Sequence, residues 1–470
     1  MHGARVGRPR DRRRASDSGK GLNRMAFFQG AFWFLIPFLI LIGVMILIHE
    51  LGHFWAARFF DVHVETFSFG FGPRLFGFRR GETDYRVSAV FFLGGFVKMA
   101  GEIPGDDTAN DPRGFLAKPR WQRLIIVLAG PIMNVVLAVG LLNGLYMVKY
   151  QKVVDAEIGA VVGSVAPATP AAKAGIQEGD RIVKLDSKRN PTWDDIELQE
   201  IESAAHPMHL AVERNGKQFQ TTVTPTLDER SGAGTAGWSE TGEVQLGPVT
   251  AGMPAQKVGL QQGDLILSAG GHPIHATVRF HEVIRGSGGK PVLIDFERHG
   301  KPMQVTVQPV WSSADGPARW VIGAYVERKL NIVTSRLSLP DALHESVNEN
   351  VRSAGLIFQV LQGVVERRIS PKLLSGPVGI AQMSGQAAKA GPSTFIAFMA
   401  MVSLNLAVVN LMPLPILDGG SVVMLIIEMV MRRDLSMSVK EAVFKVGFVF
   451  IMMLVAFVLY NDITKILPAG

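Results

Sequence analysis

The stretch AFWFLIPFLILIGVMILIHELGH, residues 31–53, indicates what class of protein this chain is. Its first eighteen residues, 31–48, carry no charge, and a run of that length can begin a membrane-spanning helix. We expect the helix to continue to about Ala57. The run is too long for the core of a signal peptide and no small-residue cleavage site follows it, so we expect it to remain in the protein.

Three further runs without charge lie later in the chain. They cover residues 124–148, 392–417 and 446–460. The last run is short, but Lys445 at its edge can extend its side chain to the membrane surface. The apolar stretch 422–427 is too short to cross, and we expect it to complete the third helix after a break. The sequence therefore predicts a polytopic α-helical membrane protein with about four spans.

Residues 64–99, between the first two predicted spans, have a different pattern. Aromatic residues alternate with small ones, and Gly and Pro interrupt the run, which is typical of strands and turns. Strands next to a membrane helix must be buried in protein or line a wet cavity. We therefore expect a membrane-associated β-hairpin region here.

Residues 155–310 are polar, rich in β-branched residues and contain an internal repeat. Its matching pairs share an offset of 84 residues: AGIQEGD at 174–180 with VGLQQGD at 258–264, ERNG at 213–216 with ERHG at 297–300, and VTP at 223–225 with VQP at 307–309. Each copy resembles a PDZ domain of the bacterial type, whose usual core pattern is A-x-x-A-G-[IL]-x-x-G-D-x-I. The resemblance implies two mixed α/β domains that bind peptides or chain ends. A simple spacer is the alternative.

The HELGH motif, residues 49–53, contains residues that can bind a metal ion and transfer a proton. His49 and His53 are one helical turn apart, so both imidazoles face the same way and can hold one Zn²⁺. Glu50 lies about 100° around the helix, near enough to reach a water at the metal. Zinc lowers the pKa of that water, and the carboxylate takes its proton as the water attacks a carbonyl group. Ionisable residues at membrane depth are functional by default, although a bare helix end at the interface is the alternative.

A catalytic zinc site needs a third protein ligand. The chain has no Cys, and His63 lies in the polar exit of the first helix. Asp418 remains, as the lone carboxylate of the apolar region 392–427. The prolines and glycines of NLMPLPILDGG, residues 410–420, break the helix, which is tolerated beside a cavity or a partner chain. We predict a His₂Asp site with an open position for water. A kink capped by Asp418 is the alternative, and another divalent metal would fit the same ligands.

HELGH together with N-x-x-P-x-P-x-L-D-G-G resembles the site-2 protease family of intramembrane zinc metalloproteases. GGFVKM at 94–99 resembles the membrane-associated β-hairpin of that family, and GPIMN at 130–134 resembles its G-P-x-x-N motif. Two PDZ domains between spans two and three resemble one branch of the family. The resemblance covers about residues 28–465 in order. Ser421 is a departure, because such enzymes often have a larger polar residue there.

The resemblance implies a metalloendopeptidase with one Zn²⁺ per chain, held by His49, His53 and Asp418, and with Glu50 as the base. It also implies four residues that help to hold an unwound substrate: Asn405, Asn410, Pro413 and Pro415. The substrates expected from the resemblance are single-span membrane proteins in envelope stress signalling, such as pre-cleaved anti-sigma factors, and remnant signal peptides. The exported PDZ pair would exclude substrates with bulky exported domains.

The net charge of +7 invites a nucleic-acid function, but its location argues against one. Residues 1–24 hold eight basic and two acidic residues and so carry +6 of that +7. We therefore expect no nucleic-acid partner. This head has no apolar period, which predicts disorder, and we hypothesise that translation starts at Met25. The absence of Cys excludes disulfides, iron–sulfur clusters and Cys-type zinc sites.

The other basic residues predict the orientation in the membrane. Ten of them lie from Arg58 to Arg123, and Arg432, Arg433 and Lys440 lie between spans three and four. The positive-inside rule places both segments in the cytoplasm. The repeats are then exported, and the active site lies toward the cytoplasmic side of the membrane. The family resemblance implies that this is a bacterial inner membrane, with the repeats in the periplasm. A genuine head that stays inside would reverse this orientation.

The predicted organisation has six parts. They are the head at 1–24, a first membrane half at 28–150, PDZ-like domains at 155–226 and 243–310, an amphipathic exported linker at 335–390, and a second membrane half at 391–465. Within the linker, residues 339–365 have apolar positions at helical spacing. They predict a helix that lies on the exported membrane face or one that packs on the PDZ pair.

Two other functional classes fit parts of the sequence. A catalytically inactive membrane PDZ scaffold or receptor would have no need of the intact HELGH motif and Asp418. A membrane-anchored metalloprotease with a soluble active site would keep its HExxH motif outside the spans, whereas His49 directly follows Ile48. Both alternatives are therefore less consistent with the sequence than an intramembrane protease.

Overall fold

The computed structural model describes residues 14–102, 111–153, 159–227, 233–313, 318–366 and 369–466. The chain divides into two compact units. The first contains the described residues up to Tyr150 together with 336–358 and 375–464. The second contains the described residues of 151–335 and 359–374, together with 465–466.

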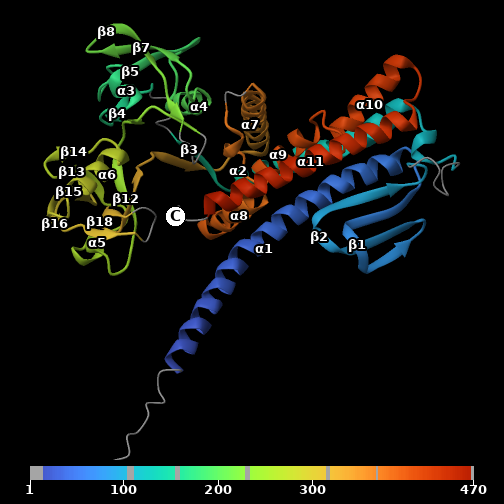
Figure 1. Cartoon of the computed structure of the whole chain (residues 1–470), viewed down its shortest axis with the longest axis horizontal. Helices are drawn as coiled ribbons and strands as arrows, with labels where there is room; N and C mark the ends of the chain where they lie inside the picture. The colour runs from blue at the N-terminus through green and yellow to red at the C-terminus, as the bar shows by residue number, and fades with distance from the viewer. Residues whose placement is uncertain are drawn as a thin grey trace, which may run out of the picture. The chain divides into compact units, whose positions relative to one another are not determined.

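Within the described part of the chain, four helices are long and apolar enough to cross a membrane, as predicted (Figure 1). The candidate spans are Phe34–Phe59, Arg120–Val148, Pro392–Asn410 and Met437–Thr464. They lie in α1 (Arg14–Phe59), α2 (Arg120–Val148), α9 (Pro392–Asn410) and α11 (Met437–Ile466). All four helices belong largely to the first unit, which is therefore the membrane part of the protein.

The predicted disorder of the head differs from the structure in residues 14–24, which form the first turns of α1. Residues 1–13 lie outside the described residues. Arg, Lys, Ala and Leu are good helix formers, and extending an existing helix avoids the cost of nucleation. The charge pattern alone did not capture this continuation.

The third span ends earlier than the uncharged run predicts. Helix α9 ends at Asn410, because Pro413 and Pro415 cannot continue a helix. Residues 422–427 belong to a separate helix, α10 (Asp418–Met431), which is 14 residues long. The break between α9 and α10 therefore places Asp418 at the first turn of a new helix.

The membrane helices pack through small residues and apolar clusters. Helix α2 contacts α1, α9 and α10, while α8 (Pro377–Ala390) contacts α1 and α9. Gly52 of α1 lies so close to the carbonyl group of Ala129 that a Cβ atom at Gly52 would overlap it. Leu41 and Met45 of α1 pack against Met399 of α9. This packing fixes the end of the first span against α2.

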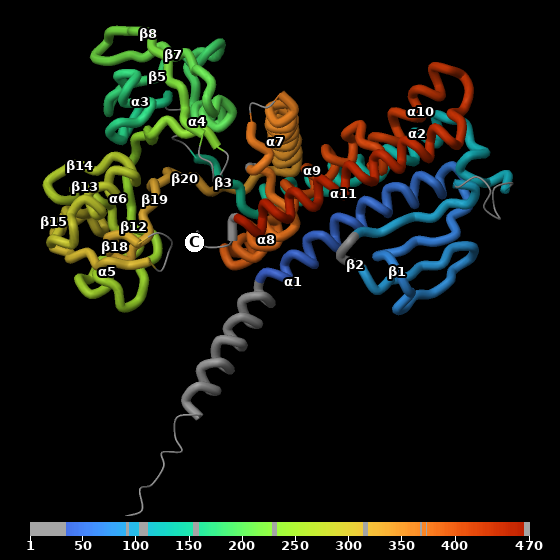
Figure 2. The backbone as a smooth tube through the Cα atoms, viewed as in Figure 1, coloured from blue at the N-terminus to red at the C-terminus, as the bar shows by residue number. Residues whose placement is uncertain are grey.

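Strands β1 (Val64–Arg80) and β2 (Thr83–Met99) occupy the region where the sequence predicts strands. Both bend, so that residues 66–69 pair with 84–87 on one side and with 95–98 on the other, while 76–80 pair with 83–87. This antiparallel sheet contacts α1 (Figures 1 and 2). Residues 95–97 form an outer edge that pairs with no further strand among the described residues.

The first unit also contains a short 3-10 turn, Phe115–Ala117, and most of helix α7. A second 3-10 turn, Pro371–Leu373, belongs to the second unit. Helix α7 (Leu339–Val365) has an amphipathic pattern, as predicted. Its residues Ala354 and Ile357 pack against Leu142 of α2 and Leu404 of α9, whereas Phe358 is 68% exposed. Part of this helix thus rests on the membrane helices.

The second unit contains the sequence repeat. Its first half comprises β3 (Tyr150–Val153), β4 (Val162–Val165), α3 (Pro170–Lys173), β5 (Arg181–Leu185), β6 (Lys188–Arg189), α4 (Trp193–Glu202), β7 (Met208–Arg214), β8 (Lys217–Val223), β9 (Thr226–Leu227), β10 (Gly234–Thr235) and β11 (Trp238–Glu240). Its second half comprises β12 (Val244–Val249), α5 (Pro254–Lys257), β13 (Leu265–Ala269), β14 (His272–Pro273), α6 (Thr277–Gly286), β15 (Val292–Arg298), β16 (Lys301–Val307), β17 (Val310–Ser312), β18 (Arg319–Val321), β19 (Ala324–Arg328) and β20 (Ile332–Ser335).

The two repeats use the same interactions at the same offset. Arg214 makes two hydrogen bonds to Asp180, at 2.6 and 2.7 Å, and Arg298 binds Asp264 with the same two distances. The hairpins β7–β8 and β15–β16 both turn through two residues with positive φ, Asn215-Gly216 and His299-Gly300. Positive φ at both central residues is the type I′ turn that suits a hairpin. Strand β19 is the last strand of the second repeat's sheet.

Candidate metal centre

Helix α1 presents His49, Glu50 and His53 near the end of the first candidate span. The Nε2 atoms of His49 and His53 lie 3.2 Å apart, as the spacing of one helical turn predicts. Both side chains are largely buried, with 11% and 12% of their surface exposed. The two imidazoles therefore converge on one point, away from bulk water.

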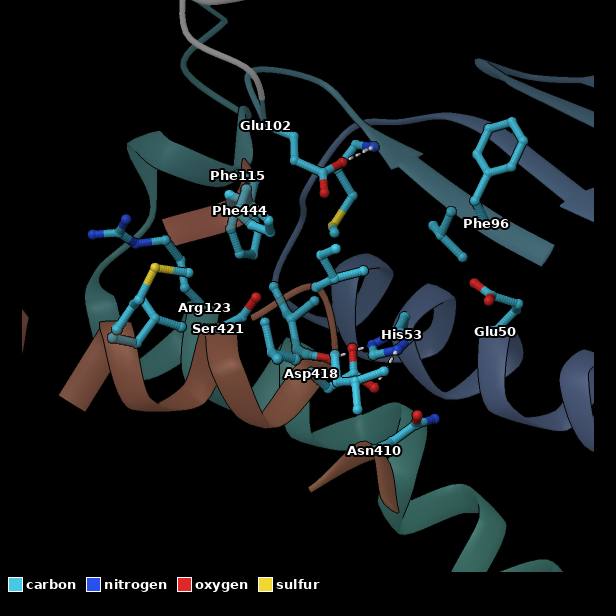
Figure 3. A pocket seen from close by; sticks show the side chains of 18 of the residues that line it. Glu50, His53, Phe96, Glu102, Phe115, Arg123, Asn410, Asp418, Ser421 and Phe444 are labelled. Atoms are coloured by element: carbon cyan, nitrogen blue, oxygen red, sulfur yellow. Dashed lines mark hydrogen bonds and ion pairs between the residues drawn. The ribbon is translucent and has the colours of Figure 1, made fainter. Parts of the chain in front are cut away.

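Asp418 reaches the same point from the first turn of α10. Its Oδ2 lies 3.1 Å from Nε2 of His49 and 3.6 Å from Nε2 of His53. Figure 3 shows the carboxylate facing His53, with Glu50 on the neighbouring turn of the same helix. The structure thus brings together the three residues that the sequence predicts as metal ligands, with one ligand atom from each within 4.8 Å of the others.

These three residues fit a metal ion. Oδ2 of Asp418 is buried and has no hydrogen-bond partner among the described residues, which is costly unless a cation satisfies it. Nδ1 of His53 lies 2.8 Å from the carbonyl oxygen of Ile126 and must donate to it, which leaves the lone pair on Nε2. Two imidazoles and one carboxylate are the donors of a catalytic zinc site.

The site opens into a cavity of about 490 Å³. His49, Glu50, His53 and Asp418 line one part of it, and Phe96 and Val97 of β2 line another (Figure 3). Gly95 lies directly against Glu50, since a Cβ atom there would be 2.9 Å from Cγ of Glu50. Sequence reasoning did not single out Gly95, although its place in a Gly-Gly pair is a signal of close backbone approach.

Only one of the four residues predicted to hold substrate lines the cavity. Asn410 lines it, at the last residue of α9 (Figure 3). Asn405, Pro413 and Pro415 are not among the residues that line it. Oδ1 of Asn405 is buried without a hydrogen-bond partner in the described part of the chain.

The loop before Asp418 is held by the two glycines that follow it. A Cβ atom at Gly419 would overlap the carbonyl group of Leu411, and one at Gly420 would overlap that of Leu414. Ile416 has φ +86°, a strained conformation for a β-branched residue, and its side chain lines the cavity. The Asp-Gly-Gly sequence therefore allows the loop to fold back tightly, which sets the position of Asp418.

A buried charge network at another part of the cavity was not predicted. Glu428 of α10 is fully buried, with Lys440 Nζ at 2.7 Å and Arg123 Nη1 at 3.7 Å. Arg123 also donates to Asp434 at 3.1 Å. Arg123, Glu428 and Lys440 all line the cavity. A lone acid at the end of the apolar helix α10 was the sequence signal that could have revealed this network.

Comparison with known proteins identifies the family. A family model described as Peptidase family M50 matches residues 37–454, which is most of the chain. The chain belongs to peptidase family M50. The match extends over HELGH and Asp418, so the candidate metal centre lies within the region that defines the M50 family assignment.

Curated relatives agree with the M50 assignment. The Regulator of sigma-E protease RseP of Escherichia coli K12 is 30% identical over 462 residues, which cover 92% of this chain and 99% of that protein. A putative zinc metalloprotease of Vibrio cholerae is 30% identical over 456 residues, with the same coverage. Among solved structures, one match is the PDZ domain of the SdrC-like protein of Listeria monocytogenes. It is 24% identical in sequence, covers 19% of this chain and 90% of the solved chain, and has a TM-score of 0.17.

Proposed function

We propose that this M50 peptidase is an intramembrane protease that hydrolyses peptide bonds within the transmembrane segments of single-span membrane proteins. The observation that carries the proposal is the position of the candidate ligands: His49 and His53 lie on the first candidate span, and Asp418 meets them there. The enzyme is a metalloendopeptidase, and its cofactor is zinc. A peptidase whose metal ligands lie on a membrane helix acts on bonds that reach membrane depth.

We assign one Zn²⁺ per chain to His49, His53 and Asp418. Zinc, when bound, lowers the pKa of water and polarises a carbonyl group. Glu50 is the proposed base, because it directly follows His49 on α1 and borders the same cavity. It takes a proton from the attacking water and gives it to the leaving amine. Gly95 leaves room for the Glu50 side chain to reach that position.

The substrate must be extended, because helical carbonyl groups are hydrogen-bonded and shielded. The outer edge at 95–97 borders the cavity and pairs with no described strand other than β1, so it can accept an extended segment by strand addition. Asn410 lines the cavity and can hydrogen-bond a backbone that has lost its helical partners. We propose that Asn405, Pro413 and Pro415 support the same segment by shaping the end of α9 and the loop after it.

We propose that residues 155–226 and 243–310 belong to two PDZ-like domains, which also include 234–240 and 319–328 respectively, and that these domains bind peptides or chain ends. In the first repeat, the carboxylate of Glu200 accepts hydrogen bonds from the backbone N–H of Ala236 at 2.5 Å and from the indole of Trp238 at 2.6 Å. This arrangement resembles a bound chain end supplied by the protein itself. The offset of 84 residues puts Ile284 at the position of Glu200 in the second repeat.

The second repeat is therefore the better candidate for binding a chain end. Ala255 donates to the carbonyl of Ile322 as Ala171 does to that of Ala236, so the two loops correspond. Strand β19, which follows Ile322, is the last strand of its sheet and has a free outer edge among the described strands. An extended peptide could add to this edge with its carboxylate near Ile322.

We propose a location in a bacterial inner membrane, with the repeats on the periplasmic side and the active site toward the cytoplasm. The multi-pass character rests on the four candidate spans, and the orientation rests on the basic segments that flank them. Relatives named as regulators of sigma-E protease support substrates such as pre-cleaved anti-sigma factors. Remnant signal peptides have the same short, single-span character and are proposed as a second class.

Cleavage of a single-span model substrate by purified protein in detergent tests the proposal. Wild type should cut within the apolar segment, as mapped by mass spectrometry, and Glu50→Gln should lose about 10²–10⁴-fold in rate. Ser421→Ala, which changes another residue of the cavity lining, serves as a control for nonspecific damage. Equal cleavage by wild type and Glu50→Gln would favour an inactive scaffold and a contaminating protease. Cleavage confined to soluble segments would contradict the intramembrane assignment.

A further inference from the structure

Helix α2 contacts both histidines of the candidate metal centre. Ile126, Gly130 and Asn134 are spaced four residues apart and lie on one face of the helix. The carbonyl group of Ile126 accepts from His53, and Gly130 lies so close to both imidazoles that a Cβ atom there would overlap His53. Asn134 lies next to His49, with its Nδ2 atom 3.3 Å from Nδ1 of the imidazole. One face of α2 thus supports the whole His pair.

One of the two polar atoms of the Asn134 amide lacks a hydrogen-bond partner among the described residues. The residue is fully buried, and its Oδ1 has no partner among the described residues. A buried amide oxygen without a partner is costly. Oxygen and nitrogen of an amide have nearly the same shape, so a half-turn of the group exchanges them without new contacts. After that exchange, Oδ1 is the atom that faces Nδ1 of His49.

The geometry of His49 decides between the two amide orientations. Its Nε2 faces Oδ2 of Asp418 at 3.1 Å and Nε2 of His53 at 3.2 Å, so Nε2 is the atom available to a metal ion. A metal-binding Nε2 must be unprotonated, which puts the proton on Nδ1. That N–H needs an acceptor, and the unpaired Oδ1 of Asn134 is the acceptor at hand.

We propose that Asn134 is a positioning residue for the zinc site, whose amide oxygen accepts from Nδ1–H of His49 and fixes the imidazole in its metal-binding form. The backbone of Asn134 is itself held, because Ser403 of α9 donates to its carbonyl oxygen at 2.8 Å and is fully buried. The same helix thus orients both histidines, His53 through the Ile126 carbonyl and His49 through the Asn134 side chain. The inference rests on the proposed zinc ligands.

The test measures zinc affinity by competition with a chromogenic chelator, using the full-length protein in detergent. Asn134→Leu keeps the approximate size of the side chain and removes the acceptor, so zinc affinity should fall about 10–100-fold. Asn134→Asp keeps an acceptor and should retain affinity near that of wild type. Asn143→Leu is the matched control, because Asn143 lies on the same helix and its Oδ1 also lacks a described partner. It should bind zinc as wild type does.

Thermal unfolding of the metal-free proteins shows whether a variant loses zinc because its fold is less stable or because His49 is no longer held in place. A role confined to helix packing predicts that Asn134→Asp loses as much zinc affinity as Asn134→Leu, and that result would overturn the proposal. Unchanged zinc affinity in Asn134→Leu would also overturn it. His49→Ala tests the underlying assignment separately: full zinc affinity in that variant would reject His49 as a ligand, whatever Asn134 does.

Discussion

Oδ2 of Asp418 lies 3.1 Å from Nε2 of His49, although one residue belongs to the first span and the other follows the third. Neither α1 nor α10 contains a complete set of ligands. The site exists because α2 packs against both helices and because the loop before Asp418 folds back on Gly419 and Gly420. Metal binding should therefore be sensitive to helix packing as well as to the ligands themselves.

Substituting Gly130 by Ala should impair the metal site through packing alone. A Cβ atom at Gly130 would overlap His53 and lie 2.9 Å from Cε1 of His49, so the imidazoles or α2 must shift. We expect loss of zinc and a fall of about 10²-fold in cleavage rate, because displacements of about 1 Å cost that much. Zinc content and initial rate check this.

Gly140 provides the matched control on the same helix. A Cβ atom at Gly140 meets no atom within 4 Å, so Gly140→Ala should leave zinc content and cleavage unchanged. If Gly130→Ala behaved like Gly140→Ala, the close packing of α2 on the His pair would be contradicted.

The sequence predicted the four spans and the three candidate ligands because their signals are local or compositional. Uncharged runs mark spans, and a lone acid such as Asp418 is conspicuous within one. The contributions of Ile126 and Gly95 were not predicted. A backbone carbonyl leaves no chemical signature in a sequence, and the pair Gly94-Gly95 signals a close backbone approach without showing that Glu50 is the neighbour. The break at Asn410 was anticipated from two prolines, but the separate helix α10 was not, because its apolar run is shorter than the helix.

The buried pair of Arg123 and Glu428 should stabilise the fold only while both partners are present. Glu428→Leu leaves Arg123 and Lys440 without their buried acid, which should lower the free energy of unfolding by about 3–5 kcal/mol. Combining it with Arg123→Met should restore part of that loss, because one of the two uncompensated cations is removed while Lys440 remains. Equilibrium unfolding in mixed micelles measures both. A double variant less stable than Glu428→Leu would contradict this account.

The stability of the first repeat should depend on pH through Asp195. Burial alone would raise the pKa of this carboxyl, but hydrogen bonds from Lys188 and Thr192 outweigh it and lower the pKa. A lowered pKa gives stability that is present above the pKa of the unfolded chain and is lost as pH falls through the folded value. Asp195→Asn should therefore destabilise α4 at pH 7 by about 1 kcal/mol.

Hydrogen exchange of the α4 amides in the full-length protein checks this prediction. Wild type and Asp195→Asn should differ in protection near neutral pH, and the difference should shrink as the medium becomes acidic. A difference that stays constant down to pH values below the pKa of Asp195 would show that charge plays no part in this helix cap.

Zinc content per chain in Asp418→Ala, compared with wild type and Glu50→Gln, tests the central claim most directly. The account predicts about one zinc in wild type and in Glu50→Gln, since a base is not a ligand, and a nearly zinc-free Asp418→Ala. A full complement of zinc in Asp418→Ala would contradict the assignment of this residue, and with it the metal centre built from the first span and α10.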